Sequence, residues 1–118
     1  MDMPIIVNDN GDISLFANIK DAELYLEPDD IKQNLYEIFN RNGDLLKPII
    51  LKNSKKFLFG NFIKENIQIT PHIPNINDRE YLFKILFNFC NNIKLEVPKE
   101  INLNDLIDKL IKEIGFTK

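Results

Sequence analysis

The sequence predicts an α+β fold: an antiparallel β-sheet with a short N-terminal helix and two C-terminal helices packed on one face. Short β-favouring runs separated by turn residues fill the chain up to residue 70, as in antiparallel sheets. Beyond residue 77, apolar side chains recur at helical spacing. Strands that precede helices are typical of α+β proteins. A length of 118 residues predicts a single domain, residues 1–118.

The N-terminal part predicts a hairpin followed by a short helix. Asn10-Gly11 separates two β-favouring runs, residues 5–7 and 12–16, and this dipeptide accepts the positive φ of a tight turn. Asn18 can then cap a helix over residues 19–26, because an Asn side chain accepts a hydrogen bond from the first helical turn.

Pro28 should end this helix, because the residue before a proline is disfavoured in the α region. The adjacent acids Asp29-Asp30 are then expected in a turn. Asn42-Gly43 predicts a second hairpin, between strands at residues 35–39 and 45–52.

The middle of the chain predicts further short strands. Pro48 cannot donate to a ladder, so its strand should lie at an edge or carry a bulge. Gly60 suggests a bulge as well. The other expected elements are a turn at residues 53–55, strands at 56–63 and 66–70, and a proline-punctuated connection at 70–77.

Two amphipathic helices are expected to complete the fold. Asn77 resembles the cap of a helix over residues 78–92, and Asn102 that of a helix over residues 103–114. Gly115 is a natural stop for the second helix.

The charge of the chain is strongly polarised, although the formal net charge is only −3. Residues 1–44 contain ten carboxylates against three basic side chains, and residues 47–66 contain five Lys and one Glu. A surface of one sign steers association with a partner of the opposite sign. The sequence therefore predicts a binding protein whose acidic part meets the partner.

No motif for catalysis, cofactor binding or metal binding stands out, and we expect no enzyme. Zinc sites use about four Cys or His ligands, whereas the chain has only His72 and Cys90. Cys90 is expected to be a small buried hydrophobe, and His72 a solvated loop residue. Residues 8–12 resemble calcium ligands, but their flanks are predicted strands, so a plain turn is preferred. The glycines are too isolated for a phosphate-binding loop.

The predicted location is the cytoplasm. The N-terminus lacks the basic and apolar regions of a secretory signal. No run approaches the roughly 20 apolar residues of a membrane span, so we expect no membrane partner. The single cysteine excludes an intrachain disulfide.

Nucleic-acid binding stays open as an alternative. Lysines between Lys47 and Lys64 are interleaved with Phe57, Phe59 and Phe62, a pattern typical of stacking platforms. A pI near 5.1 opposes phosphate binding by the molecule as a whole. We therefore do not expect nucleic acid to be the principal partner.

Two short segments carry a family resemblance, NGDI at residues 10–13 and DAELYLEPDD at residues 21–30. They resemble a family of small bacterial proteins with an NGD hairpin and an AE-x-YLEP-x-D helix end. The members sit beside toxin genes and are taken as immunity proteins of polymorphic toxin and contact-dependent growth inhibition systems. The resemblance covers residues 1–46, and YLEP is its most specific part. Further matching positions are Phe16, Tyr36, Phe39, Gly43, Leu45 and Leu46.

The resemblance implies a protein that binds and neutralises a cognate toxin domain, without catalytic residues of its own. Many such toxins are nucleases with basic clefts, which an acidic inhibitor complements. Tyr25 and Tyr36 are candidate anchors or core residues, and Leu26 should pack its helix on the sheet. The alternative is a small cytoplasmic accessory or regulatory protein, with nucleic acid contacted through Lys47–Lys64. The oligomeric state stays open. The candidate partner contacts are Asp21, Glu23, Glu27, Asp29, Asp30 and Glu37.

Overall fold

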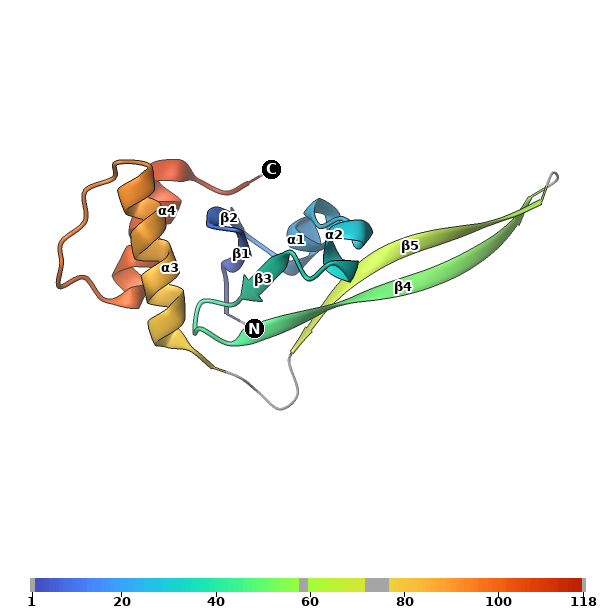
Figure 1. The fold of residues 1–118 in the computed structure, drawn as a ribbon, viewed down its shortest axis with the longest axis horizontal. Coiled ribbons are helices and arrows are strands. Elements are labelled where there is room, and N and C mark those ends of the chain that lie inside the picture. Colours follow the sequence, from blue (N-terminus) through green and yellow to red (C-terminus); the bar gives the residue numbers. More distant parts are fainter. Residues whose placement is uncertain (1, 58–59, 72–76, 118) are drawn as a thin grey trace.

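The computed structural model describes residues 2–57, 60–71 and 77–117, and these contain a five-stranded sheet and four helices. The strand order is β2-β1-β3-β4-β5, and every neighbouring pair is antiparallel (Figure 1). The α+β class is therefore confirmed. The strands are β1 (Ile5–Asp9), β2 (Asp12–Phe16), β3 (Tyr36–Phe39), β4 (Leu45–Phe57) and β5 (Gly60–Pro71). The helices are α1 (Ile19–Tyr25), α2 (Pro28–Lys32), α3 (Arg79–Asn92) and α4 (Leu103–Ile114).

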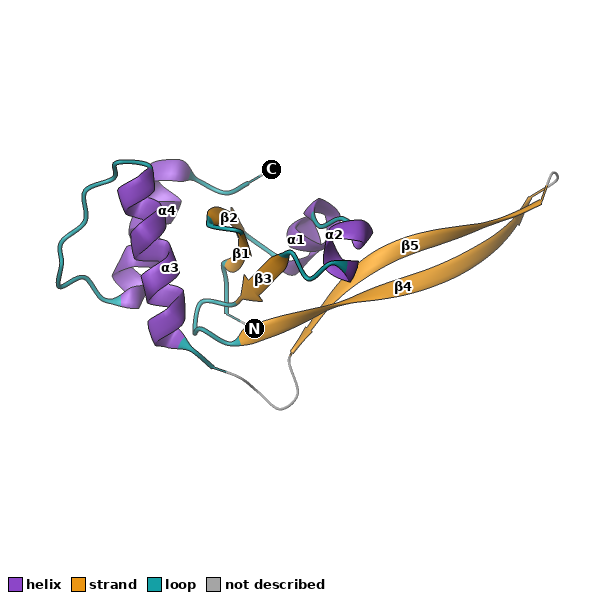
Figure 2. Ribbon diagram, viewed as in Figure 1, coloured by secondary structure: helices purple, strands orange, loops and turns teal. Residues whose placement is uncertain are grey.

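Helices cover both faces of the sheet (Figure 2). Successive side chains of a strand point to opposite faces. Ile6 and Phe39 accordingly pack in one cluster with α3 and α4, whereas Ile5 and Ile38 pack in another with α1 and α2. The two C-terminal helices share one face, as predicted. The expectation that the short N-terminal helix packs on that face as well is wrong, because Ala22 and Leu26 pack with the strand residues that point to the other face. Cys90 is buried in the α3–α4 cluster, as expected.

The predictions for the first hairpin and helix are confirmed. Asn10 and Gly11 have φ values of 51° and 95°. The Asn8 side chain accepts a hydrogen bond from the Gly11 N–H at 2.8 Å, so this segment is a plain hairpin turn. The Asn18 side chain caps α1 by accepting a hydrogen bond from the Asp21 N–H at 2.8 Å.

Pro28 ends α1, but it also begins α2, a helix that the sequence did not predict. Proline suits the first helical position, where its missing N–H has no intrahelical partner in any case. The prediction of a turn at Asp29-Asp30 is therefore wrong. Both residues lie in the first turn of α2, where the helix dipole favours carboxylates.

The loop between β3 and β4 is the second predicted hairpin turn. Gly43 has a φ of 85°. The Asn40 side chain accepts hydrogen bonds from the N–H groups of Asn42 and Asp44 at 2.9 and 3.1 Å. These local bonds satisfy backbone donors that the ladder leaves unpaired.

β4 and β5 form one long two-stranded ribbon, with a register that is continuous over twelve pairs. In the described residues, β3 pairs with β4 only at Leu45 and Leu46. The edge of β4 beyond them therefore faces no other strand of the described chain. Pro48 lies on this edge, as predicted.

The ribbon replaces the shorter strands that were predicted here. The turn expected at residues 53–55 is wrong, and so are the separate strands at 56–63 and 66–70. Gly60 pairs with Phe57 in the unbroken register, so no bulge occurs there. Continuous cross-strand pairing outweighs the weak turn preference of Asn and Ser, because strand stability depends on the neighbouring strand more than on local propensity.

The C-terminal helices begin near the predicted positions. The Asn102 side chain caps α4 by accepting from the Asp105 N–H at 2.8 Å, and Gly115, with a φ of 73°, follows its last turn. The cap of α3 is Asp78 rather than Asn77. Asn77 is occupied elsewhere, since its amide donates hydrogen bonds to the β3–β4 loop.

The ribbon extends well beyond the rest of the molecule (Figure 1). The extents are 60 × 30 × 22 Å and the radius of gyration is 16.3 Å, whereas a compact domain of this length has a radius of about 13–14 Å. We call the paired residues 47–57 and 60–70 the arm, and the rest of the described chain the body. No described helix combines the length and apolar character needed to cross a membrane.

Candidate partner-binding surface

The six carboxylates predicted as partner contacts do not form one continuous surface. Five lie on α1, on α2 or on the link between these helices, whereas Glu37 lies on β3. Three of the six are exposed and three are partly buried with hydrogen-bond partners. The exposed members are Asp21, Glu27 and Asp29, and the partly buried members are Glu23, Asp30 and Glu37.

Glu23 ties α1 to β5. Its Oε2 accepts a hydrogen bond from the Ile69 N–H at 2.7 Å. Ile69 lies opposite Pro48 in the ladder, and Pro48 has no N–H. The two residues fit a non-hydrogen-bonded pair, in which the N–H of Ile69 points away from β4. Glu23 thus accepts a hydrogen bond from a buried backbone N–H that the ladder leaves unpaired. The role of Glu23 is therefore structural.

Asp30 braces α2 against β3. Its Oδ2 accepts a hydrogen bond from the Tyr36 hydroxyl at 2.8 Å. Burial, followed by the hydrogen bond and the charge of Asp30, raises the pKa of the Tyr36 phenol well above its ordinary value. The ring is partly buried and packs against the α1–α2 cluster. Tyr36 is thus placed as a packing residue.

Glu37 lies on the sheet face that carries α3. Its Oε1 accepts hydrogen bonds from the Asn8 amide at 2.8 Å and from the Tyr81 hydroxyl at 2.6 Å. The bond to Glu37, followed by burial, raises the pKa of Tyr81 to about 12. Phe39 and Leu45 line a pocket of about 280 Å³ beside this pair. Glu37 therefore serves to join β1, β3 and α3.

Three exposed apolar side chains gather near the C-terminal end of α1, and we call them the α1 patch: Leu24, Tyr25 and Phe116. Their exposed fractions are 76%, 39% and 42%. They line a groove of about 530 Å³ together with Asp21 and Thr117. The Tyr25 ring rests on the buried ring of Phe16, with centroids 5.0 Å apart.

The chain after α4 completes this patch. The Thr117 N–H donates a hydrogen bond to the Leu15 carbonyl at 2.7 Å, which holds Phe116 beside α1. The sequence indicated Tyr25 but not Leu24 or Phe116. Leu24 could have been found, because it lies off the buried stripe of α1, which contains Ala22. Phe116 could not, since only the tertiary fold brings it to α1.

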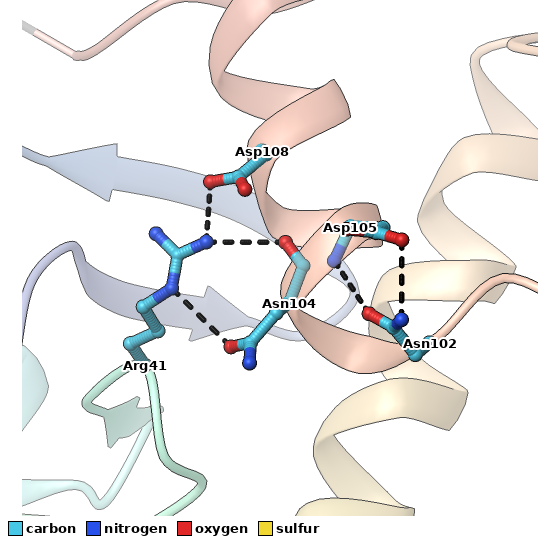
Figure 3. A network of polar contacts seen from close by, with 5 residues as sticks. All are labelled: Arg41, Asn102, Asn104, Asp105 and Asp108. Carbon is cyan, nitrogen blue, oxygen red and sulfur yellow. Dashed lines mark hydrogen bonds and ion pairs between the residues drawn. The ribbon is translucent and has the colours of Figure 1, made fainter.

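Two of the three basic side chains within the acidic segment form ion pairs, and the third, Lys20 on α1, is exposed. Figure 3 shows Arg41, from the β3–β4 loop, reaching α4, where its guanidinium donates to the Asn104 carbonyl at 3.1 Å and to the Asp108 carboxylate. Lys32 forms an ion pair with Glu65 at 3.0 Å. Arg41 and Lys32 are therefore partly neutralised by carboxylates from outside the segment, and Lys20 is the basic side chain that opposes the carboxylates of α1.

The basic segment of the sequence is the arm. Lys47 is exposed at its base and Lys52 midway along it. The side chains of residues 53–64, including Phe57 and Phe62 of the predicted stacking pattern, lie outside those that the structure describes, and so do Phe59 and the predicted loop residue His72. Within the described residues, no three His, Cys, Asp or Glu side chains gather as a metal site.

The arrangement suits protein binding at the α1 patch. An apolar centre beside a charged margin resembles the anatomy of protein–protein interfaces. Asp21 lines the groove, and the exposed Glu27 and Asp29 follow α1 in the chain. The chain was compared with models of known protein families, with characterised proteins and with solved structures, and it matches none of them.

Proposed function

We propose that this protein is a cytoplasmic immunity protein that binds and neutralises a cognate bacterial toxin domain of the nuclease type. The observation that carries the proposal is the exposure of Leu24 and Tyr25 inside the segment of family resemblance, DAELYLEPDD. Large apolar side chains held at the surface by a folded helix are typical of interaction sites.

The charge of the same region supports a basic partner. Asp21 lines the groove of the α1 patch, and Glu27 and Asp29 are exposed two to four residues beyond Tyr25 along the chain. Carboxylates in this position would be steered to the basic cleft of a nuclease, and they would compete there with substrate phosphates. The apolar patch then supplies desolvated contacts that slow dissociation.

The first experiment is a protection assay. Cells express the C-terminal toxin domain encoded beside the gene for this chain, with or without the chain itself, and survivors are counted. The proposal predicts rescue that is lost when the chain is omitted. Toxicity that persists despite soluble expression of the chain would contradict it.

Leu24 and Leu26 form a matched pair that separates binding from folding. Leu26 is 4% exposed and packs in the α1–α2 cluster, so Leu26→Ala should cost about 2–4 kcal/mol of stability. Leu24→Ala should leave stability within about 0.5 kcal/mol, yet weaken toxin binding by roughly 1 kcal/mol or more. Chemical denaturation and titration calorimetry measure the two effects. Unaltered toxin affinity in Leu24→Ala would remove the α1 patch from the interface.

The electrostatic contribution has its own test. Asp30 accepts a hydrogen bond from Tyr36, so a reversal of its charge would change stability as well as toxin binding. The exposed pair Glu27 and Asp29 is therefore the better choice for charge reversal. Glu27→Lys with Asp29→Lys should slow association with the toxin and flatten its dependence on salt. Rates and salt slopes equal to those of the wild type would show that these carboxylates face away from the toxin.

The second candidate function is that of an accessory or regulatory protein that contacts nucleic acid through Lys47–Lys64. The projection of the basic arm from the body favours it (Figure 1). A gel-shift assay at low salt tests it, since phosphate binding weakens steeply as salt rises. Absence of any shift at low salt would eliminate this candidate.

A further inference from the structure

We propose that the arm is a self-association surface, and that its occupant is the α1 patch of a second copy of this chain. This inference rests on the arm and does not depend on the proposed immunity function.

The described chain supports only the inner half of the arm. An isolated two-stranded ribbon is at best marginally stable in water. The contacts that join the arm to the body lie in this inner half, where Ile67 and Ile69 pack with α1 and Lys32 pairs with Glu65. Farther out, residues 53–57 and 60–64 pair with one another and with no other described strand.

Charge favours an acidic partner for the arm. The sequence of the arm contains five lysines and one carboxylate, Glu65, and Glu65 is already paired with Lys32 of the body. Two arms would repel each other, since lysines on edge strands oppose edge-to-edge pairing. The arm therefore fits exposed carboxylates, and the body carries Asp21 in the groove of the α1 patch and Glu27 and Asp29 farther along the chain.

The arm also carries an exposed apolar side chain. Leu51, midway along the arm, is 42% exposed and has exposed Lys52 beside it. The α1 patch offers the counterpart, an apolar groove with Asp21 in its wall. Apolar contact at the centre and opposite charges at the margin describe a complementary pair of surfaces.

A second copy carries both surfaces, so the contact is made twice. The arm of each copy then lies on the α1 patch of the other, which is the closed two-fold arrangement that most homodimers adopt. Since the α1 patch is also the proposed toxin surface, the second copy and the toxin would compete for it.

Sedimentation velocity of the purified chain, without toxin, tests the inference. A concentration series at low salt should reveal a dimer, and added salt should weaken it because exposed charges are screened. A monomer throughout the low-salt series would overturn the proposal, and this result needs no variant to be interpreted.

Charge reversal locates the contact. Lys47→Glu with Lys52→Glu in the arm, or Glu27→Lys with Asp29→Lys at the patch, should each weaken the dimer about tenfold. A mixture of the two variants should recover a heterodimer, because the reversed charges again complement each other. The matched controls carry the same change of charge at exposed positions elsewhere: Lys84→Glu with Lys112→Glu, and Glu96→Lys with Glu100→Lys.

Two other outcomes would overturn the assignment. A dimer equally strong in the wild type, the arm variant and the patch variant, all shown to be folded by circular dichroism, would be formed by another surface. A monomer that retards a short DNA duplex at low salt, with the retardation lost in the arm variant, would assign the arm to nucleic acid.

Discussion

At the scale of single residues, the carboxylates of this chain divide into those that hold the fold and those that are free to meet a partner. Glu23, Asp30 and Glu37 accept hydrogen bonds from a strand N–H or a tyrosine hydroxyl. The sequence could not distinguish them from Glu27 or Asp29, because the partner of Glu23 is 46 residues away along the chain. Composition predicts a charged segment, but only the tertiary fold decides which charges are engaged.

Glu23→Ala should destabilise the protein by about 1–3 kcal/mol, because it leaves the buried Ile69 N–H without an acceptor. Glu27→Ala removes the same charge from an exposed position and serves as the control, with an expected change within about 0.5 kcal/mol. Urea denaturation of the two variants measures the difference. Equal midpoints would mean that water replaces the carboxylate at Ile69.

Tyr81 makes the stability of the fold sensitive to alkaline pH. The folded pKa of about 12 exceeds the ordinary value of 10.0, so the folded state holds the phenol proton more tightly than the unfolded state. This contribution is complete below pH 10 and is lost as pH rises through 12. Tyr81→Phe should therefore lower stability by about 1 kcal/mol at neutral pH, and the difference from wild type should shrink above pH 10.

Denaturation at a series of alkaline pH values measures this effect. Tyr25→Phe is the control, because Tyr25 is about as exposed as Tyr81, 39% against 36%, but makes no hydroxyl bond to a carboxylate of the described residues such as the one from Tyr81 to Glu37. If the difference in unfolding free energy between wild type and Tyr81→Phe stays constant from neutral to alkaline pH, then ionisation of Tyr81 does not contribute to the pH dependence of stability.

At the scale of elements, the sequence predicts features with a strong local signal and misses those that depend on distant pairing. The caps of α1 and α4 and both Asn-Gly turns are correct, because each needs only a few adjacent residues. Helix α2 was missed since Pro28 was interpreted as a stop rather than a start. The length of the arm was missed since its ladder joins residues that are far apart in the sequence.

Gly43 shows how one turn positions a distant helix. A Cβ added there would lie 2.9 Å from Arg79 Cγ, at the start of α3, and the φ of 85° adds strain. Gly43→Ala should therefore cost about 2–4 kcal/mol. Gly11→Ala has a similar φ of 95° but no atom within 4 Å of the new Cβ, so it should cost only about 1–2 kcal/mol. Thermal melting of both variants gives the comparison, and equal losses would mean that Arg79 moves aside without cost.

At the scale of the whole molecule, charge and shape are polarised together. The acidic segment folds into the body with α1 and α2, and the basic segment forms the arm that leaves it (Figure 1). The sequence shows the separation of charge as runs of residues of like sign. It does not predict that the basic run projects from the body, because the expected turn at residues 53–55 would have kept residues 47–66 close to it.

Removing the outer part of the arm, residues 54–63, tests what this part contributes to self-association and to toxin binding. Asn53 and Lys64 form a cross-strand pair four residues before Phe57 and Gly60, the pair that closes the ribbon. Hydrogen-bonded and non-hydrogen-bonded pairs alternate along an antiparallel ladder, so these two pairs are of the same kind. Replacing residues 54–63 by Asn-Gly should therefore close a two-residue hairpin there, as Asn10-Gly11 does between β1 and β2. Ile67, Ile69 and Glu65 keep their contacts with α1 and α2, so the shortened chain should fold.

The shortened chain keeps Lys47, Leu51 and Lys52 but loses Lys55 and Lys56, so its dimer should be weaker in sedimentation velocity. It should keep protection against the toxin, because the α1 patch is untouched. Apparent toxin affinity should rise wherever the full-length chain is dimeric, since its competitor is weakened. A folded shortened chain that dimerises as strongly as the full-length chain would show that residues 54–63 take no part in self-association. One that fails to protect would place the outer arm within the toxin interface, where the free end of the ribbon, rather than α1, would make the decisive contact.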